Sequence, residues 1–224
     1  MTTQPITEFD RFVYIVSHDL QEPLRMVSSF ISLINKKHAD SLPPDCAEYM
    51  GYITENADKM NKMIRSLVDY SRVERNREEM VNIDLTILIE DMLTMFGPEM
   101  SLSEAAIELD TLPTIKAQPT LILTLFRNIF QNAFENRNQN PLRLALRVRD
   151  EGDRWGFSLE DNGLGIDSDH LGSIFEMFRK VDPKSERVGA GLAISQAIVR
   201  KYGGVMAAES TKGKGTKISF SLPK

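Results

Sequence analysis

The chain has 224 residues and a formal net charge of −5, so it can form one large domain or two small ones. The mildly negative charge excludes the basic surface expected of a nucleic-acid-binding protein. The single cysteine, Cys46, excludes an intramolecular disulfide framework and fits a reducing compartment. Residues 1–8 lack the pattern of a signal peptide, and no run of about 18 apolar residues occurs. We therefore expect a cytoplasmic protein without a transmembrane segment.

The first third of the chain predicts two long helices. In each, apolar residues recur at alternating steps of four and three, the heptad spacing of helices that pack side by side. The first run contains Phe9, Val13, Val16, Leu20, Pro23, Val27, Phe30 and Ile34. The second run contains Cys46, Met50, Ile53, Ala57, Met60, Ile64, Leu67 and Ser71. A break at residues 38–44 separates the runs, and Asp45 is placed to cap the second helix.

Two such helices joined by a short turn form an antiparallel hairpin whose apolar seam needs a partner. Dimerisation into a four-helix bundle buries the seam, so we expect a homodimer. The alternative is an ordinary hairpin that docks on the rest of the chain. Because the segment 72–79 is highly charged, we expect a helical domain at residues 1–75 and a second domain at residues 76–224.

The second domain is predicted to be α+β because helical and strand patterns are mixed along it. Helices are expected at residues 86–96, 119–136 and 191–202. Strands are expected at residues 80–85, 106–109, 142–149, 155–160, 205–209 and 216–222. The last four strands form two consecutive pairs. We therefore expect an α/β sandwich with helices on one face of a mixed sheet.

The first candidate site is His18, in the segment SHDLQEPLR at residues 17–25. Because it lies between two seam positions, its imidazole should face solvent. Imidazole is a nucleophile near neutral pH when one ring nitrogen is free, and Asp19 can hold the other nitrogen protonated or accept its proton. Pro23 leaves the carbonyl of Asp19 without its usual helical partner. The simpler interpretation is a surface histidine without a function.

Two further sites carry groups that suit a nucleotide. Asp161 begins the segment DNGLGI after an expected strand, and its carboxylate can accept a hydrogen bond from the exocyclic amine of a base. Gly163 and Gly165 allow the backbone to approach a ligand closely. Asn128 and Asn132 share one helix face, so their carboxamide oxygens can reach one Mg²⁺ ion.

The segment around Gly189 and Gly191 predicts a phosphate site. A glycine-containing turn that opens a helix presents free amide groups and the positive end of the helix dipole. The polar residues 180–188 before it are expected to form a mobile lid. A second glycine turn, at Gly213 and Gly215, is expected to close on the same pocket.

The order of these motifs resembles the sensor histidine kinases. SHDLQEPLR, RNIFQNA, DNGLGI, IFEMF and GAGLAIS follow one another as in that family, and HDLQEPLR resembles the phytochrome-type kinases. The resemblance implies a dimeric hairpin followed by a Bergerat-type ATP-binding domain. It implies that ATP phosphorylates His18, with Asp19 as its base, and that an aspartate of a response regulator then takes the phosphoryl group.

The resemblance also implies the roles of the nucleotide-site residues. Asn132, with Asn128, would hold Mg²⁺, and Asp161 would bind the adenine amine. The base pocket would be shaped by Gly163 and Gly165. The residues near the phosphates would be Lys180, Gly189 and Gly191.

Some positions depart from the family pattern. Glu135 and Asn136 stand where many members have a lysine and an aromatic residue, and Arg187 and Val188 replace part of the glycine-rich turn. These departures motivate an alternative, a histidine phosphotransferase with a degenerate nucleotide domain that does not use ATP. A third interpretation is a binding module that sequesters a partner. Without a recognisable sensor domain, we expect a sensor acting in trans, a longer natural protein, or a minimal kinase driven by a partner.

Overall fold

The computed structural model describes residues 8–38, 41–180 and 188–224. It contains two compact units. One includes residues 8–38 and 41–72, and the other includes residues 73–180 and 189–224. Among the described helices, none combines the length and the apolar character needed to span a membrane.

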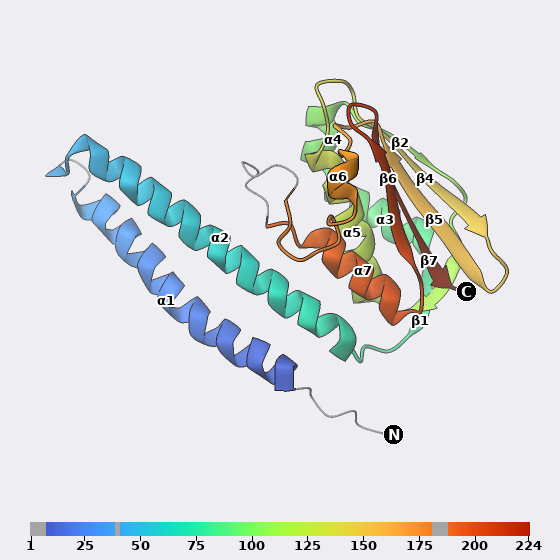
Figure 1. Ribbon diagram of the computed structural model, residues 1–224, viewed down its shortest axis with the longest axis horizontal. Coiled ribbons are helices and arrows are strands. Elements are labelled where there is room, and N and C mark those ends of the chain that lie inside the picture. Colours follow the sequence, from blue (N-terminus) through green and yellow to red (C-terminus); the bar gives the residue numbers. More distant parts are fainter. Residues whose placement is uncertain (1–7, 39–40, 181–187) are drawn as a thin grey trace. The chain divides into compact units, whose positions relative to one another are not determined.

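The first unit contains the two expected helices, α1 (Glu8–His38) and α2 (Pro44–Arg75), except for the last three residues of α2. They run antiparallel beside each other, as Figure 1 shows. α2 begins at Pro44, so the prediction that Asp45 caps this helix is wrong, and Asp45 lies in the first turn. Proline suits the first turn because its missing amide hydrogen would have no helical partner there.

The predicted apolar seam of α1 is only partly buried between the two helices. Among the described side chains of the two helices, the buried ones are Val13, Ser17, Ile31, Met50, Ala57, Ser71 and Val73. Four predicted seam residues remain exposed, at 39–56% of their surface: Leu20, Val27, Phe30 and Ile34. A single partner helix covers only one side of α1, so the neighbouring apolar stripe stays in contact with solvent.

The second unit is built on a five-stranded sheet in the order β2-β4-β5-β7-β6. Its strands are β2 (Ala106–Leu109), β4 (Arg143–Asp150), β5 (Arg154–Asp161), β6 (Met206–Thr211) and β7 (Gly215–Pro223). The β2 strand is parallel to β4, and the other neighbours are antiparallel, so the sheet is mixed as expected. A separate pair joins β1 (Val81–Asp84) to β3 (Thr114–Ala117).

Helices α3 (Leu85–Thr94), α5 (Pro119–Glu135) and α7 (Gly191–Lys201) cover one face of the five-stranded sheet (Figure 1). The core between the layers contains Phe126 of α5 with Phe157 and Phe220 of the strands. Their ring centroids lie 5.2 to 5.9 Å apart. Such pairs contribute about 0.5–1.5 kcal/mol each beyond the area they bury. On the other face, Arg147 binds the carboxylate of Glu108, which suits a solvated surface.

Three short elements were not predicted from the sequence: α4 (Gly97–Ser103), β3 and α6 (Ser168–Leu171). Each is four to seven residues long, which is too short for hydrophobic periodicity to distinguish helix from strand. The strand β3 exists because it pairs with β1, a contact between segments about 30 residues apart in the chain.

The segment that follows α2 is tied to the sheet-covering helices by a buried cluster around Gln118. The Gln118 Nε2 donates to the carbonyl oxygens of Asn76, at 2.9 Å, and Glu78, at 3.0 Å. Its Oε1 accepts from the hydroxyl of Tyr202, at 3.1 Å. Lys201 Nζ also donates to the carbonyl of Asn76. One side chain therefore joins the linker to the start of α5 and the end of α7.

Replacing Gln118 by alanine is expected to lower the free energy of unfolding by about 2–3 kcal/mol, because buried polar groups lose their partners. Gln131→Ala is the matched control, since Gln131 is exposed on α5 and its Nε2 donates to Glu135. Urea unfolding measures both. A change below about 0.5 kcal/mol in Gln118→Ala, the range of ordinary surface substitutions, would contradict the role assigned to this cluster.

Candidate functional site

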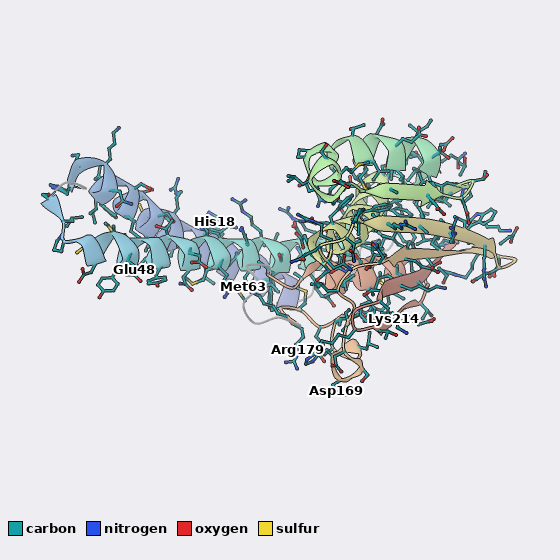
Figure 2. All side chains as sticks on the ribbon, turned by 90° about the horizontal axis from the view of Figure 1, so that it is seen from above. His18, Glu48, Met63, Asp169, Arg179 and Lys214 are labelled. Atoms are coloured by element: carbon teal, nitrogen blue, oxygen red, sulfur yellow. The ribbon has the colours of Figure 1, made fainter. Side chains whose placement is uncertain are left out.

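His18 lies on α1 with 73% of its side chain exposed, so its imidazole faces solvent as predicted. Figure 2 labels it on the hairpin. Its Nδ1 is 3.2 Å from Oδ1 of Asp19, whose side chain is 69% exposed. A carboxylate at Nδ1 favours the tautomer that carries its proton there, which leaves the lone pair of Nε2 for attack on an electrophile.

The two asparagines expected to bind Mg²⁺ lie on α5, and both are half-buried. Asn128 Nδ2 donates to the carbonyl of Gly191, at 3.2 Å, which places the asparagine face beside the start of α7. Asn132 Oδ1 accepts from Asn136 Nδ2, at 3.0 Å. Carboxamide oxygens are hard ligands, so this donor set fits a Mg²⁺ ion that also binds phosphates.

The start of α7 has the features of a phosphate site. The helix opens at Gly191, and its N-cap residue, Ala190, provides no side-chain hydrogen bond to the first amides. These amides and the helix dipole are thus available to an anion. Gly189 has a φ of +74°, and a Cβ at this position would collide with the carbonyl of Arg179. Phe178 N donates to the Gly189 carbonyl, at 2.8 Å.

Asp161 ends β5 and is half-buried. Its Oδ1 accepts from the backbone amides of Gly163, at 2.8 Å, and Thr216, at 3.2 Å. Burial raises the pKa of this carboxyl, although both amide hydrogen bonds act in the opposite direction. Because both amides reach the same oxygen, the other carboxylate oxygen can accept from the amine of a base.

The loop after Asp161 is held by the turn between β6 and β7. Gly165 has a φ of +63°, and a Cβ there would collide with the carbonyl of Thr211. Gly213 N donates to the Leu164 carbonyl, at 2.7 Å. The hydroxyl of Ser210 accepts from Ile166 N, at 2.8 Å. The two glycine-containing segments therefore form one connected structure.

The structure brings the predicted nucleotide residues together in two contacts. Asn128 meets Gly191, and the end of α5 meets the Asp161 loop, because Leu164 N donates to the Asn136 carbonyl at 2.8 Å. Lys180 is half-buried at the end of a described segment. The predicted lid at residues 180–188, with Arg187, lies mostly outside the described residues. His18 belongs to the other compact unit.

Three residues that shape this site were not predicted from the sequence: Ser210, Thr216 and Asn136. Ser210 and Thr216 are register partners on either side of the glycine turn, and their hydroxyls lie 2.9 Å apart. Their position beside Gly213 was the available signal. Asn136 was noticed only as a departure from the family pattern, since the sequence does not reveal the direction of its carboxamide.

Comparison with known families assigns each of the two units to a family of domains. Residues 10–76 match the His Kinase A (phospho-acceptor) domain, and residues 117–224 match the histidine kinase-, DNA gyrase B- and HSP90-like ATPase family. This chain belongs to the histidine kinases. The kinase therefore combines a phospho-acceptor hairpin, α1 and α2, with an ATPase domain built on the five-stranded sheet.

The kinase is similar to two phytochromes. It is 30% identical to cyanobacterial phytochrome A of Nostoc sp. over 218 residues, 96% of this chain and 28% of the relative. It is 27% identical to the phytochrome-like protein Cph1 of Synechocystis sp., covering 96% of this chain and 29% of the relative. The kinase thus spans less than a third of the length of these relatives.

Solved structures share the fold of the kinase. The crystal structure of full-length ShkA in complex with AMPPNP matches it with a TM-score of 0.71 and 22% sequence identity, covering 95% of this chain and 45% of that chain. The Acinetobacter baumannii histidine kinase AdeS matches with a TM-score of 0.63 and 20% identity, covering 90% of this chain and 96% of that chain.

Proposed function

We propose that this chain autophosphorylates His18 from ATP and then transfers the phosphoryl group to an aspartate of a response regulator receiver domain. The observation that carries the proposal is the half-buried Asp161, whose Oδ1 holds two backbone amides in an ATPase-family domain. Its second oxygen is suited to the adenine amine. The AMPPNP complex of ShkA, a protein of the same fold, supports a nucleotide here.

We assign the phosphate end of the nucleotide to the start of α7. Gly189 and Gly191 shape that turn, and Gly163 and Gly165 shape the base pocket. Lys180 would supply a positive charge to the phosphates, as the family resemblance implies. Asn128 and Asn132 would hold Mg²⁺, which neutralises the charge of the phosphates when it is bound.

The chemical step uses the exposed imidazole. Nε2 of His18 attacks the γ-phosphorus of ATP, the bond to the β–γ bridging oxygen breaks, and ADP leaves with that electron pair. Positive charge develops on the ring, and Asp19 relieves it by accepting the Nδ1 proton. The exposure of His18 lets both the ATP and the response regulator reach the same nitrogen.

We infer that the hairpin forms a homodimeric four-helix bundle. The exposed apolar residues of α1 continue into a groove shared with α2, and a second hairpin would bury both. The groove is lined by Leu24, Val27, Tyr52, Ile53, Asn56, Ala57 and Met60. We place the functional boundary between residues 75 and 76, where α2 ends. A sensor acting in trans or within a longer chain would supply the signal.

Incubation with γ-labelled ATP and Mg²⁺ tests this function. We expect label that is stable to alkali and lost in acid, as a phosphoramidate requires, and its transfer to a receiver domain. The opposite result is the absence of nucleotide binding in calorimetry while a phosphorylated regulator still labels His18. That result would establish the phosphotransferase instead, with Glu135 and Asn136 marking a degenerate nucleotide site.

A further inference from the structure

Asn136 is the C-cap residue of α5, one turn after Asn132. Its Nδ2 donates to the Asn132 carbonyl oxygen, at 2.6 Å, and to the Asn132 side-chain oxygen Oδ1, at 3.0 Å. Its backbone amide also donates to the Asn132 carbonyl, at 3.1 Å. The carboxamide of Asn136 is therefore held against Asn132 by its own main chain and side chain.

The other side of Asn136 contacts the adenine loop. Its carbonyl oxygen accepts from Leu164 N, at 2.8 Å. A Cβ on Gly163 would collide with the same carbonyl, so the loop approaches Asn136 as closely as glycine allows. Asn136 thus contacts the asparagine assigned to Mg²⁺ and the loop that begins at Asp161.

We propose that Asn136 is a positioning residue that orients the side chain of Asn132 for Mg²⁺. A carboxamide oxygen has two lone pairs, so the Asn136 donor can occupy one and fix the amide plane while the other faces the metal. Groups that hydrogen-bond a metal ligand typically set the orientation of that ligand. This inference rests on the proposed function, in which Asn132 binds Mg²⁺.

The position of Asn132 explains why such support matters. It lies in the last turn of α5, which ends at Glu135, and the ends of helices fray. The Asn136 side chain gives the Asn132 carbonyl a second donor beside the Asn136 backbone amide, and the same amino group restrains the Asn132 carboxamide. Removing it frees the ligand to rotate without removing the ligand itself.

Asn136→Leu keeps the branched shape of the side chain and removes the donor, and Asn136→Ala removes it without adding bulk. Asn138→Leu is the matched control, because Asn138 Nδ2 donates to the Asn162 carbonyl, at 2.8 Å, and so supports the same loop through Asn162 rather than through Asn132. ATP affinity is measured at a series of Mg²⁺ concentrations and in EDTA, with a thermal melt of each variant.

We expect both Asn136 variants to need at least about ten-fold more Mg²⁺ for half-maximal ATP affinity, the usual loss when a group behind a metal ligand is removed. Their affinity for ATP in EDTA should stay within about two-fold of the unmodified kinase, because the adenine contacts remain. Asn138→Leu should keep the original Mg²⁺ dependence. If the leucine variant fails to fold, the same measurements on the alanine variant provide the test.

Two results would overturn this inference alone. One is an unchanged Mg²⁺ dependence in the Asn136 variants, and the other is an equal loss of affinity in EDTA and in Mg²⁺, which would mean that Asn136 only supports the loop. ATP binding that is independent of Mg²⁺ in the unmodified kinase would instead overturn the metal role of Asn132. Failure of the unmodified kinase to bind ATP would reject the proposed function itself.

Discussion

His18→Gln is expected to abolish the acid-labile label from γ-labelled ATP, because glutamine keeps a polar side chain of similar length but has no nucleophilic nitrogen. ATP affinity should not change, since the nucleotide residues belong to the other compact unit. The melting temperature should also be retained, because 73% of the His18 side chain is exposed. The loss therefore separates the chemical step from folding and from nucleotide binding.

His38→Gln is the matched control for this experiment. His38 is the last residue of the same helix and is also exposed, so its replacement should leave the label intact. Persistent label in His18→Gln, or its loss in His38→Gln alone, would assign the phospho-acceptor to a residue other than His18.

Asp161→Asn is expected to weaken ATP binding by about 100-fold, or roughly 2.7 kcal/mol. Oδ1 of the asparagine can keep the amides of Gly163 and Thr216. The new Nδ2 then takes the place of the second carboxylate oxygen and points a donor at the adenine amine, which is itself a donor. Two buried donors that face each other without an acceptor are costly, so the loss of ATP affinity should be large. Calorimetry with ATP measures it.

The same variant should not lose stability at neutral pH. Burial raises the pKa of Asp161 in the folded protein, so the folded state binds this proton more tightly than the unfolded chain. The stabilising contribution is complete below the unfolded pKa and disappears as the pH rises through the folded pKa. Relative to the unmodified kinase, the free energy of unfolding of Asp161→Asn should therefore increase across that pH window and then remain constant.

Asp110→Asn provides a control, because the pKa of Asp110 is shifted in the opposite direction from that of Asp161. Asp110 accepts from Val148 N and from Arg147, and these bonds lower its pKa. Its contribution to stability is present above the unfolded pKa and disappears as the pH falls through the folded pKa. Asp110→Asn should slightly lower stability at neutral pH and leave ATP binding unchanged. Similar ATP affinities in Asp161→Asn and Asp110→Asn would contradict the adenine role of Asp161.

Local patterns in the sequence were sufficient to predict the long elements and to identify the main motifs. The heptads of α1 and α2 and the amphipathic pattern of α5 repeat over many turns, so the period is unambiguous. The exposure of His18 followed from its offset from the heptad positions. The family resemblance then supplied the expected roles of Asp161, Asn128 and Asn132, which no single motif could have established.

The tertiary structure decided which faces and partners the elements use. Sequence periodicity could not distinguish the residues of α1 that pack on α2 from those that stay exposed, because two apolar stripes lie side by side on one helix. The bonds from Thr216 to Asp161 and from Asn136 to Asn132 depend on how the chain folds back and on the direction of each side chain. Residue identity alone carries neither kind of information, so only the folded structure shows them.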